Sequence, residues 1–457
     1  MRNRLLLLLF FLLILLSRIP FLFDGYGVEE DSWGIAVAAS NTLKTGVWEA
    51  SRLPGHPVNE FFYLLFFPLG PVALNFLSAL CSALMFFPLY GIFSLKGKQD
   101  AVVMSLGFLF IPVVYINSTC TLDYLWGMLF FTASIYFMLR ERLMLAFILL
   151  ALATGCRITY AAFILPLLFY CYQDFTWKFV KRLLLPVGVF VTLIILFYTP
   201  VFYVYGKSFF DYSDQFPYPS AAKVFYKAGI GVFGLPLFAF LPALIFFNRF
   251  TILHRSPGRF GWFLLIGMLL QACSYLALPQ KSAYLMPAAL LLWIALSKLS
   301  IPKLDRMLLV VALVSSFFFG VNVADANRGV GTESTGIRFH VNGQELTLEL
   351  FRGHLLQDLA KRKNKTRFVK RVVAELRKQR QPMGLICGWW YNQILIEIQE
   401  SAPVPKEVEL VFYPDLILIK RWESEQRKVY HLPEQEVYAE LNAGGYYFIE
   451  KSLLFCK

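Results

Sequence analysis

Residues 5–23 read LLLLLFFLLILLSRIPFLF, and Arg18 is the one charged side chain in this run of 19 residues. A helix needs about 20 predominantly apolar residues to cross a hydrocarbon core of about 30 Å, so the run is long enough to span a bilayer. Arg2 and Arg4 precede it, as in a signal peptide, but its apolar core is too long and no small-residue cleavage site follows. We therefore predict an uncleaved first membrane span.

The rest of the chain has the same apolar character. Of its 457 residues, 58% are hydrophobic and 16% are charged, and the mean hydropathy is +0.58. Soluble domains carry about 25% charged residues, so this composition excludes a soluble enzyme, a disordered protein and a fibrous repeat. We predict a polytopic α-helical membrane protein with about 11 transmembrane helices. The predicted spans are 5–23, 68–94, 101–117, 122–139, 143–155, 158–172, 183–205, 229–248, 260–278, 282–298 and 306–322.

Basic residues indicate how the chain is oriented, because short cytoplasmic loops carry an excess of Lys and Arg. With the N-terminus in the cytoplasm, the predicted inner loops hold 15 basic residues and the outer side of the membrane part holds 8. This orientation places the loop 24–60 and everything after the last span outside the cytoplasm. We expect a multi-pass protein of the plasma (inner) membrane. We expect no nucleic-acid partner, because the net charge of +13 does not come from a basic soluble face.

The chain changes character after residue 322. We predict a transmembrane domain over 1–322 and a soluble extracytoplasmic α/β domain over 323–457. Residues 344–380 look helical, and their basic run 361–365 is interpreted as a solvated helix face near lipid headgroups. Short β-rich runs follow, separated by Pro and charged residues. These runs are 384–387, 408–412, 416–419 and 446–449.

The first outer loop carries three consecutive carboxylates, Glu29, Glu30 and Asp31, followed by Ser32. Asp31 or Ser32 could simply cap the helix that follows, since both side chains accept hydrogen bonds from free backbone N–H groups. Three adjacent carboxylates exceed what a cap needs, and their repulsion would be relieved by a cation, a basic partner or a bound proton. A divalent metal held by this run is therefore an open alternative.

The same loop ends in a rigid turn, SRLPGHP over 51–57, directly before the chain becomes apolar again. Arg52, His56 and Glu60 would face the same region as the acidic run. Each of the three is also compatible with an ordinary interface or loop residue. Together with the acidic run, they indicate a polar site at the membrane surface.

Three further charges fall at the outer level of the membrane part, where ionisable side chains are costly and need an explanation. Asp123 precedes a span and could act as its N-cap. Arg157 lies between two short apolar pieces, which favours a buried partner over snorkelling to the membrane surface. Lys281 is either an interfacial anchor or part of a site. No ionisable residue falls near the middle of a predicted span, so we expect chemistry at the outer leaflet.

These stretches resemble the GT-C glycosyltransferases, a superfamily that includes protein O-mannosyltransferases and aminoarabinose transferases. The resemblance covers roughly residues 1–300 and lies in arrangement more than in identity. It rests on EDSW at 30–33, TG at 45–46, SRLPGHP at 51–57, GCR at 155–157 and KSAYLMP at 281–287. It implies a polytopic membrane enzyme in which a soluble extracytoplasmic domain follows the last span.

The resemblance also implies roles for individual residues. The first outer loop of such enzymes carries a carboxylate close to the reacting carbon, which makes Asp31 the candidate base and Glu30 the second choice. A basic residue ahead of the Tyr-Leu motif approaches the lipid phosphate in that family, which matches Lys281. The complete predicted site comprises catalytic Asp31 and Glu30, donor-phosphate-binding Lys281, Tyr284 and Arg157, substrate-binding Arg52, His56, Asp123 and Glu60, and Glu29, Glu30 and Asp31 for a metal if one is present.

The expected reaction moves a sugar from a polyprenyl-phosphate donor to an acceptor hydroxyl at the outer leaflet, with inversion. A phosphate leaving group needs a cation rather than a general acid. The hydroxyl needs one carboxylate as general base, whereas a glycosidase needs a pair of carboxylates. This chemistry requires no cofactor. The expected partners are the donor, membrane lipids and a lipid, glycan or protein acceptor.

Two other functions are compatible with an apolar bundle that carries outer charges. A transporter or flippase of lipid-linked saccharides would have polar groups near the midplane and internally repeated halves, and the sequence shows neither. A scaffold of an envelope complex would use the outer charges only as anchors.

Overall fold

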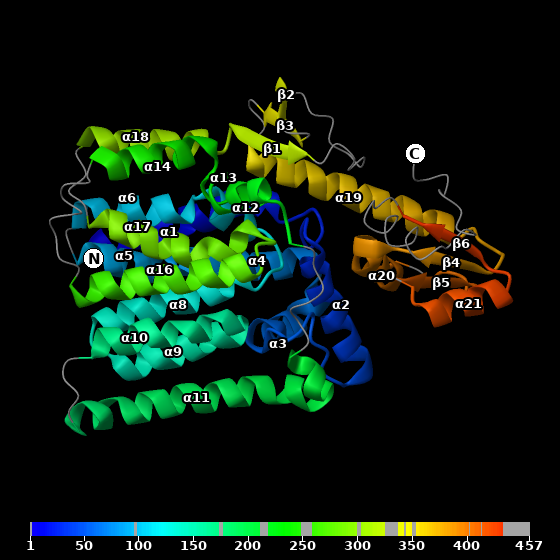
Figure 1. The fold of residues 1–457 in the computed structure, drawn as a ribbon, viewed down its shortest axis with the longest axis horizontal. Helices are drawn as coiled ribbons and strands as arrows, with labels where there is room; N and C mark the ends of the chain where they lie inside the picture. Colours follow the sequence, from blue (N-terminus) through cyan, green and yellow to red (C-terminus); the bar gives the residue numbers. More distant parts are fainter. Residues whose placement is uncertain are drawn as a thin grey trace.

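The structure is a computed structural model. It describes residues 2–95, 98–172, 177–210, 218–247, 258–298, 303–324, 337–341, 344–349, 353–401, 403–412 and 414–432. Most helices lie side by side in one bundle, and the C-terminal strands and helices lie beyond one end of it (Figure 1). The N-terminus lies at the opposite end of the bundle (Figure 1).

Four helical segments of the described chain are long and apolar enough to cross a membrane, or five if one bent pair is counted as a span. They are Arg4–Phe21, Pro71–Ser94, Val180–Phe210 and Arg259–Ala277, and they coincide with four of the predicted spans. They contain α1 (Arg2–Arg18), η1 (Ile19–Phe21), α4 (Pro71–Leu84), α5 (Phe86–Ser94), α11 (Trp177–Tyr205), η4 (Gly206–Phe210) and α16 (Arg259–Ala277). Along α1, Leu5 and Leu9 are exposed by 60% and 54%, as expected for a surface that faces lipid tails.

The other apolar stretches form shorter helices, so the count of 11 spans stays a prediction. Pro112 begins a new helix within the predicted span 101–117, because proline is tolerated in the first turn of a helix and disrupts its interior. The short helices are α6 (Lys98–Leu109), α7 (Pro112–Asn117), α8 (Tyr124–Leu139), α9 (Leu143–Cys156), η3 (Ile158–Phe163), α10 (Ile164–Cys171), η5 (Ser282–Leu285), α17 (Met286–Ser297) and α18 (Lys303–Ser315).

The bent pair lies beside the loop that carries Lys281. Its first arm comprises α12 (Ala221–Ala228) and α13 (Ile230–Phe233), and its second arm is α14 (Leu235–Phe247). The arms meet at 90°. Gly234 joins them at φ +75°, and a Cβ there would lie 2.6 Å from the Cβ of Ser316, so both the bend and the close packing require glycine.

Two helices between α1 and α4 lie at the end of the bundle nearest the C-terminal domain (Figure 1). They are α2 (Glu30–Thr45) and α3 (Pro57–Phe66), and the short turn η2 (Phe67–Leu69) follows α3. Gly46 closes α2 at φ +71°, with its N–H donated to the Thr42 carbonyl, which is a common helix C-terminus.

The C-terminal segment contains two small three-stranded sheets. β1 (Gly320–Ala324), β2 (Ile337–Val341) and β3 (Gln344–Glu349) pair antiparallel in the order β1-β3-β2. β4 (Met383–Ile386), β5 (Val408–Val411) and β6 (Lys428–His431) pair parallel in the order β5-β4-β6. The helices of this segment are α19 (His354–Leu376), η6 (Gly388–Trp390), α20 (Tyr391–Glu400) and α21 (Leu416–Ser424). Buried residues such as Val372, Leu385 and Ile394 form a core of their own.

Two expectations for this segment are wrong. Residues 344–349 form β3, so the helix expected over 344–380 begins only at His354. The run 416–419 was expected as a strand but is the first turn of α21, because the Asp415 side chain accepts a hydrogen bond from the Leu418 N–H at 2.7 Å. Ile417 is 81% exposed, which a buried strand position would not be. The run 446–449 lies outside the described residues.

Candidate active site

Hydrogen bonds from residues of the bundle hold the segment before α2. The fully buried Asn75 side chain donates to the carbonyls of Leu22 at 2.9 Å and Gly25 at 2.8 Å. The Thr121 N–H donates to the Tyr26 carbonyl at 2.9 Å. At Gly27, whose φ is +157°, a Cβ would lie 2.5 Å from the Ser32 Oγ. The start of α2 is therefore held at a defined place, and its first turn carries the acidic run.

The capping interpretation of the acidic run is wrong. Glu29 occupies the N-cap position of α2 without a side-chain cap, and Asp31 lies inside the first turn. Asp31 instead contacts both Lys281 and Arg52 as an ion pair. Lys281 Nζ also lies 2.7 Å from Glu29 Oε2. A basic partner, which was one of the three expected ways to relieve the repulsion, is therefore what the fold supplies.

Arg52 connects this ion pair to the rest of the turn 51–57. Its Nη2 lies 3.0 Å from Asp123 Oδ1, and its Nε donates to His56 Nε2 at 2.8 Å. Because Nε2 of His56 accepts that bond, Nδ1 carries the ring proton and donates it to the Cys156 carbonyl at 2.8 Å. Burial lowers the pKa of His56 to about 4, so the imidazole is neutral at physiological pH.

Asp123 is the anion that two arginines share. It is fully buried and occupies the N-cap position of α8, as expected, but its side chain makes no cap bond to that helix. Arg52 meets its Oδ1, and Arg157 Nη1 meets its Oδ2 at 2.9 Å. Two guanidinium groups therefore flank this one buried carboxylate.

Arg157 is also fixed by two aromatic rings. Its guanidinium carbon lies 4.9 Å from the ring centre of Tyr124 and 4.3 Å from that of Tyr284, a cation–π arrangement. Tyr284 lies in η5, which follows Lys281 directly. Burial would lower the pKa of Lys281, but Glu29 and the two tyrosines raise it above its ordinary value, so Lys281 is a cation.

The similarity of this chain to known proteins lies in its fold. No family model and no curated protein matches the chain. Among solved structures, ArnT from Cupriavidus metallidurans bound to undecaprenyl phosphate superposes with a TM-score of 0.58 at 16% identity, covering 95% of this chain and 94% of that one. The same enzyme in the apo state gives 0.58 at 14% identity, covering 96% and 91%. This chain has an ArnT-like fold. The predicted resemblance to GT-C enzymes is thereby confirmed at the level of the fold.

Within the ArnT fold, most of the predicted site residues meet in one connected cluster at the end of the bundle. Charged and polar contacts link Asp31, Lys281, Arg52, Asp123, Arg157 and His56. The Arg157 guanidinium lies over the Tyr284 ring, and Glu29 forms an ion pair with Lys281. Segments as distant in sequence as the loop 24–60 and the segment around Lys281 therefore converge.

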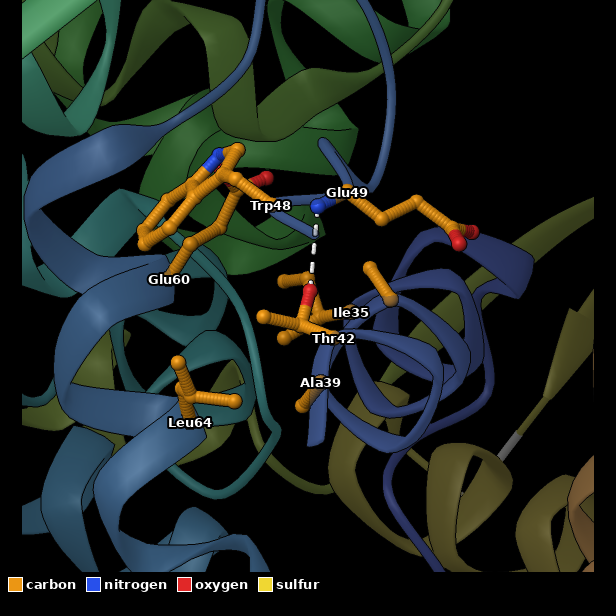
Figure 2. A pocket seen from close by; sticks show the side chains of 8 residues that line it. Ile35, Ala39, Thr42, Trp48, Glu49, Glu60 and Leu64 are labelled. Carbon is orange, nitrogen blue, oxygen red and sulfur yellow. Dashed lines mark hydrogen bonds between the residues drawn. The ribbon is translucent and has the colours of Figure 1, made fainter. Parts of the chain in front are cut away.

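Two predicted residues lie outside this cluster. Glu30 accepts a hydrogen bond from Asn392 of α20 and points to the C-terminal domain. Glu60 accepts from the Ser51 N–H at 2.9 Å and from the Ser51 Oγ at 2.6 Å. It lines a shallow hollow in which Trp48 lies beside it and Ile35, Ala39 and Thr42 of α2 form the opposite wall (Figure 2).

The acidic run does not fit a metal site. Glu29 and Asp31 both contact Lys281, whereas Glu30 turns away toward Asn392. Among the residues that the structure describes, no group of three His, Cys, Asp or Glu side chains is placed to hold a metal ion. We therefore derive no catalytic step from a metal at this run.

The contribution of the C-terminal domain to the site was not expected from the sequence. The basic run was expected to be a solvated face, but Arg362 exposes only 1% of its surface and donates to the Thr119 carbonyl at 2.9 Å. Lys365 donates to the Val28 carbonyl at 2.9 Å, directly before the acidic run. Charge density along a helix does not reveal which face a distant loop will cover, so no local signal distinguished Arg362 from its neighbours.

Proposed function

We propose that this chain is a membrane glycosyltransferase that moves a sugar from a polyprenyl-phosphate donor to an acceptor hydroxyl at the outer leaflet. The observation that carries the proposal is the contact between Asp31 and Lys281, which are 250 positions apart in the sequence. It brings a carboxylate that can act as base and a cation that can bind phosphate within reach of one substrate. The acceptor is a lipid, a glycan or a protein.

In the proposed reaction the acceptor hydroxyl attacks the anomeric carbon, and Asp31 takes the hydroxyl proton as general base. The bond from that carbon to the phosphate oxygen breaks, and its electron pair stays on the polyprenyl phosphate. A new carbon–oxygen bond forms on the opposite face of the sugar, so configuration inverts. No general acid is needed, because the phosphate leaves as an anion.

The charge that develops on the phosphate is stabilised by fixed cations. The side chains of Arg52 and Lys281 are 27% and 23% exposed and that of Arg157 is 15% exposed, whereas Asp123 is fully covered. The cations can therefore be reached by a substrate from outside, and Asp123 cannot. We replace the substrate-binding role expected for Asp123 with a positioning role behind the two arginines.

The ArnT fold supports the donor class in this proposal. One of the matched ArnT structures is bound to undecaprenyl phosphate. We infer that Lys281, Arg157 and Tyr284 take the phosphate of a similar lipid here, with Arg52 beside them. We also propose a cytoplasmic N-terminus and an extracytoplasmic C-terminal domain. Helix α2, whose first turn carries Asp31, lies at the end of the bundle nearest that domain, and the N-terminus lies at the opposite end (Figure 1).

Purified protein in nanodiscs, incubated with a panel of polyprenyl-phosphate sugars and candidate acceptors, tests the proposal. We expect transfer from at least one donor, a product of inverted anomeric configuration, and loss of transfer in Asp31→Asn. A product that retains configuration would contradict the single displacement. Movement of the lipid-linked sugar across vesicles without transfer would favour the transporter alternative.

A further inference from the structure

The C-terminal domain touches the two acidic segments of the site through three side chains that the proposed reaction does not use. Arg362 and Lys365 lie three positions apart on α19 and therefore share one helix face. Arg362 reaches the segment before Asp123, and Lys365 reaches the residue before the acidic run. Asn392, in the first turn of α20, reaches Glu30.

The contact through Arg362 is buried and extensively hydrogen-bonded. Its Nη1 donates to the carbonyls of Phe21 at 3.0 Å and Thr119 at 2.9 Å, and its Nη2 donates to Thr119 Oγ1 at 2.8 Å. Asp358 accepts from its Nε at 2.8 Å. A nearly fully buried guanidinium with this many partners ties the beginning of the outer loop and the approach to Asp123 to the same helix.

The first turn of α2 needs such support. It begins without a side-chain cap, and an uncapped helix start leaves its first N–H groups without intrahelical partners. Lys365 holds the carbonyl of Val28, and Asn392 holds the carboxylate of Glu30. Asp31 follows Glu30 directly, so any fraying of this turn would change where its carboxylate points.

We propose that Lys365 and Asn392 are positioning residues of the glycosyltransferase site, which the C-terminal domain completes by fixing the turn that presents Asp31. This inference rests on the proposed function for its kinetic consequence, but not for its structural one. Neither residue touches the reacting atoms. Both act through Val28 and Glu30.

The chain offers a matched control on the same helix. Gln399, near the end of α20, accepts a hydrogen bond from the Ser40 Oγ at 2.6 Å. It therefore also docks the C-terminal domain on α2, but ten positions beyond Glu30 along that helix. If the domain only adds stability, Asn392→Ala and Gln399→Ala will behave alike. If it positions Asp31, only Asn392→Ala will affect the site.

The experiment compares full-length wild type, Lys365→Met, Asn392→Ala, Asn392→Gln and Gln399→Ala in nanodiscs. We expect Lys365→Met and Asn392→Ala to lower kcat about tenfold, since small misplacement of a catalytic group is costly, with the KM for the lipid-linked donor changed less than twofold. Hydrogen–deuterium exchange of amides 28–32 should accelerate in the same two variants. Asn392→Gln, which keeps the amide, should recover part of kcat, and Gln399→Ala should leave both readouts unchanged.

Unchanged exchange over 28–32 in Lys365→Met and Asn392→Ala would overturn the inference, as would an equal response in Gln399→Ala. Faster exchange without a change in kcat would also overturn it, because the turn would then move without consequence for Asp31. If wild type transfers no sugar from any donor while the exchange results appear as expected, the proposed function fails and the support of the acidic turn by the C-terminal domain stands.

Discussion

Asp31 and Glu30 are neighbours in the chain but face two different regions of the molecule. Asp31 contacts Lys281 and Arg52 at the end of the bundle, whereas Glu30 contacts the uncharged amide of Asn392 in the C-terminal domain. Successive residues of a helix point about 100° apart. Adjacent residues of α2 can therefore face the cations of the bundle in one case and the C-terminal domain in the other. Burial raises the pKa of Glu30 despite its more distant cations. Direct cation partners, rather than position in the acidic run, distinguish the two carboxylates.

The largest effect should come from exchanging the two carboxylates for amides one at a time. Asp31→Asn removes the proposed base and should lower kcat by roughly a thousandfold, measured as sugar transfer by purified protein. Glu30→Gln keeps a hydrogen-bonding side chain opposite Asn392 and should lower kcat less than about tenfold. Equal loss in both variants would show that the comparison assigns the base wrongly. Melting temperatures close to wild type are the control for folding.

The next largest effect should come from Asp123, the buried carboxylate that contacts Arg52 and Arg157. Asp123→Asn leaves Arg52 and Arg157 without the buried charge that they share, which should cost about 3 kcal/mol of stability, measured by thermal unfolding in detergent. Asp415→Asn is the matched control, because Asn caps a helix about as well as Asp. Equal stability of Asp123→Asn and wild type would mean that the arginines do not depend on Asp123.

A substitution of Lys281 tests whether the cation that contacts Asp31 binds the donor phosphate. Lys281→Met removes a charge-assisted contact to phosphate and should weaken binding of undecaprenyl phosphate roughly a hundredfold, since such contacts are worth up to about 3 kcal/mol. Lys44→Met, in the exposed last turn of α2, should leave binding unchanged. Binding can be measured by scintillation proximity or native mass spectrometry. An equal loss in both variants would point to general membrane charge rather than to a phosphate site.

The smallest effect concerns the neutral histidine beside Arg52. The pKa of His56 is about 4 in the folded protein and about 6.5 in an unfolded chain, so below pH 6.5 the unfolded chain binds the proton more readily. Its contribution to stability is therefore present above pH 6.5 and is lost as pH falls toward 4, by roughly 2 kcal/mol between pH 7 and pH 5. His56→Gln should flatten this part of the stability profile. An identical slope in wild type and variant would contradict the neutral assignment.

Several parts of the fold and site could be predicted because their causes lie in the sequence itself. The run 5–23 predicted a membrane helix by length, and the position of Arg157 between two short apolar pieces predicted a buried partner, which is Asp123. The family resemblance assigned Asp31 and Lys281 to one site, which implies that the two residues converge. It could not have been derived from spacing, because nothing local links two loops 250 positions apart.

The missed features depend on partners that local pattern does not encode. Asn75 looks like one polar residue in an apolar stretch, but it donates to the carbonyls of Leu22 and Gly25 ahead of α2. Arg362 is one of several basic residues in its run, and only docking on Thr119 buries it. The apolar run 416–419 is compatible with either a strand or a helix. The Asp415 side chain caps its first turn and so stabilises the helix.

The hydrogen bond between Asn392 and Glu30 also has a consequence for biosynthesis. Its two ends are 362 positions apart, and ribosomes add about 5–20 residues per second. The acidic turn therefore emerges roughly 20 to 70 seconds before the residue that braces it has been made. During that interval the nascent polypeptide has its carboxylates in place but lacks the contact from Asn392, so the acidic turn can gain this support only after residue 392 has been added.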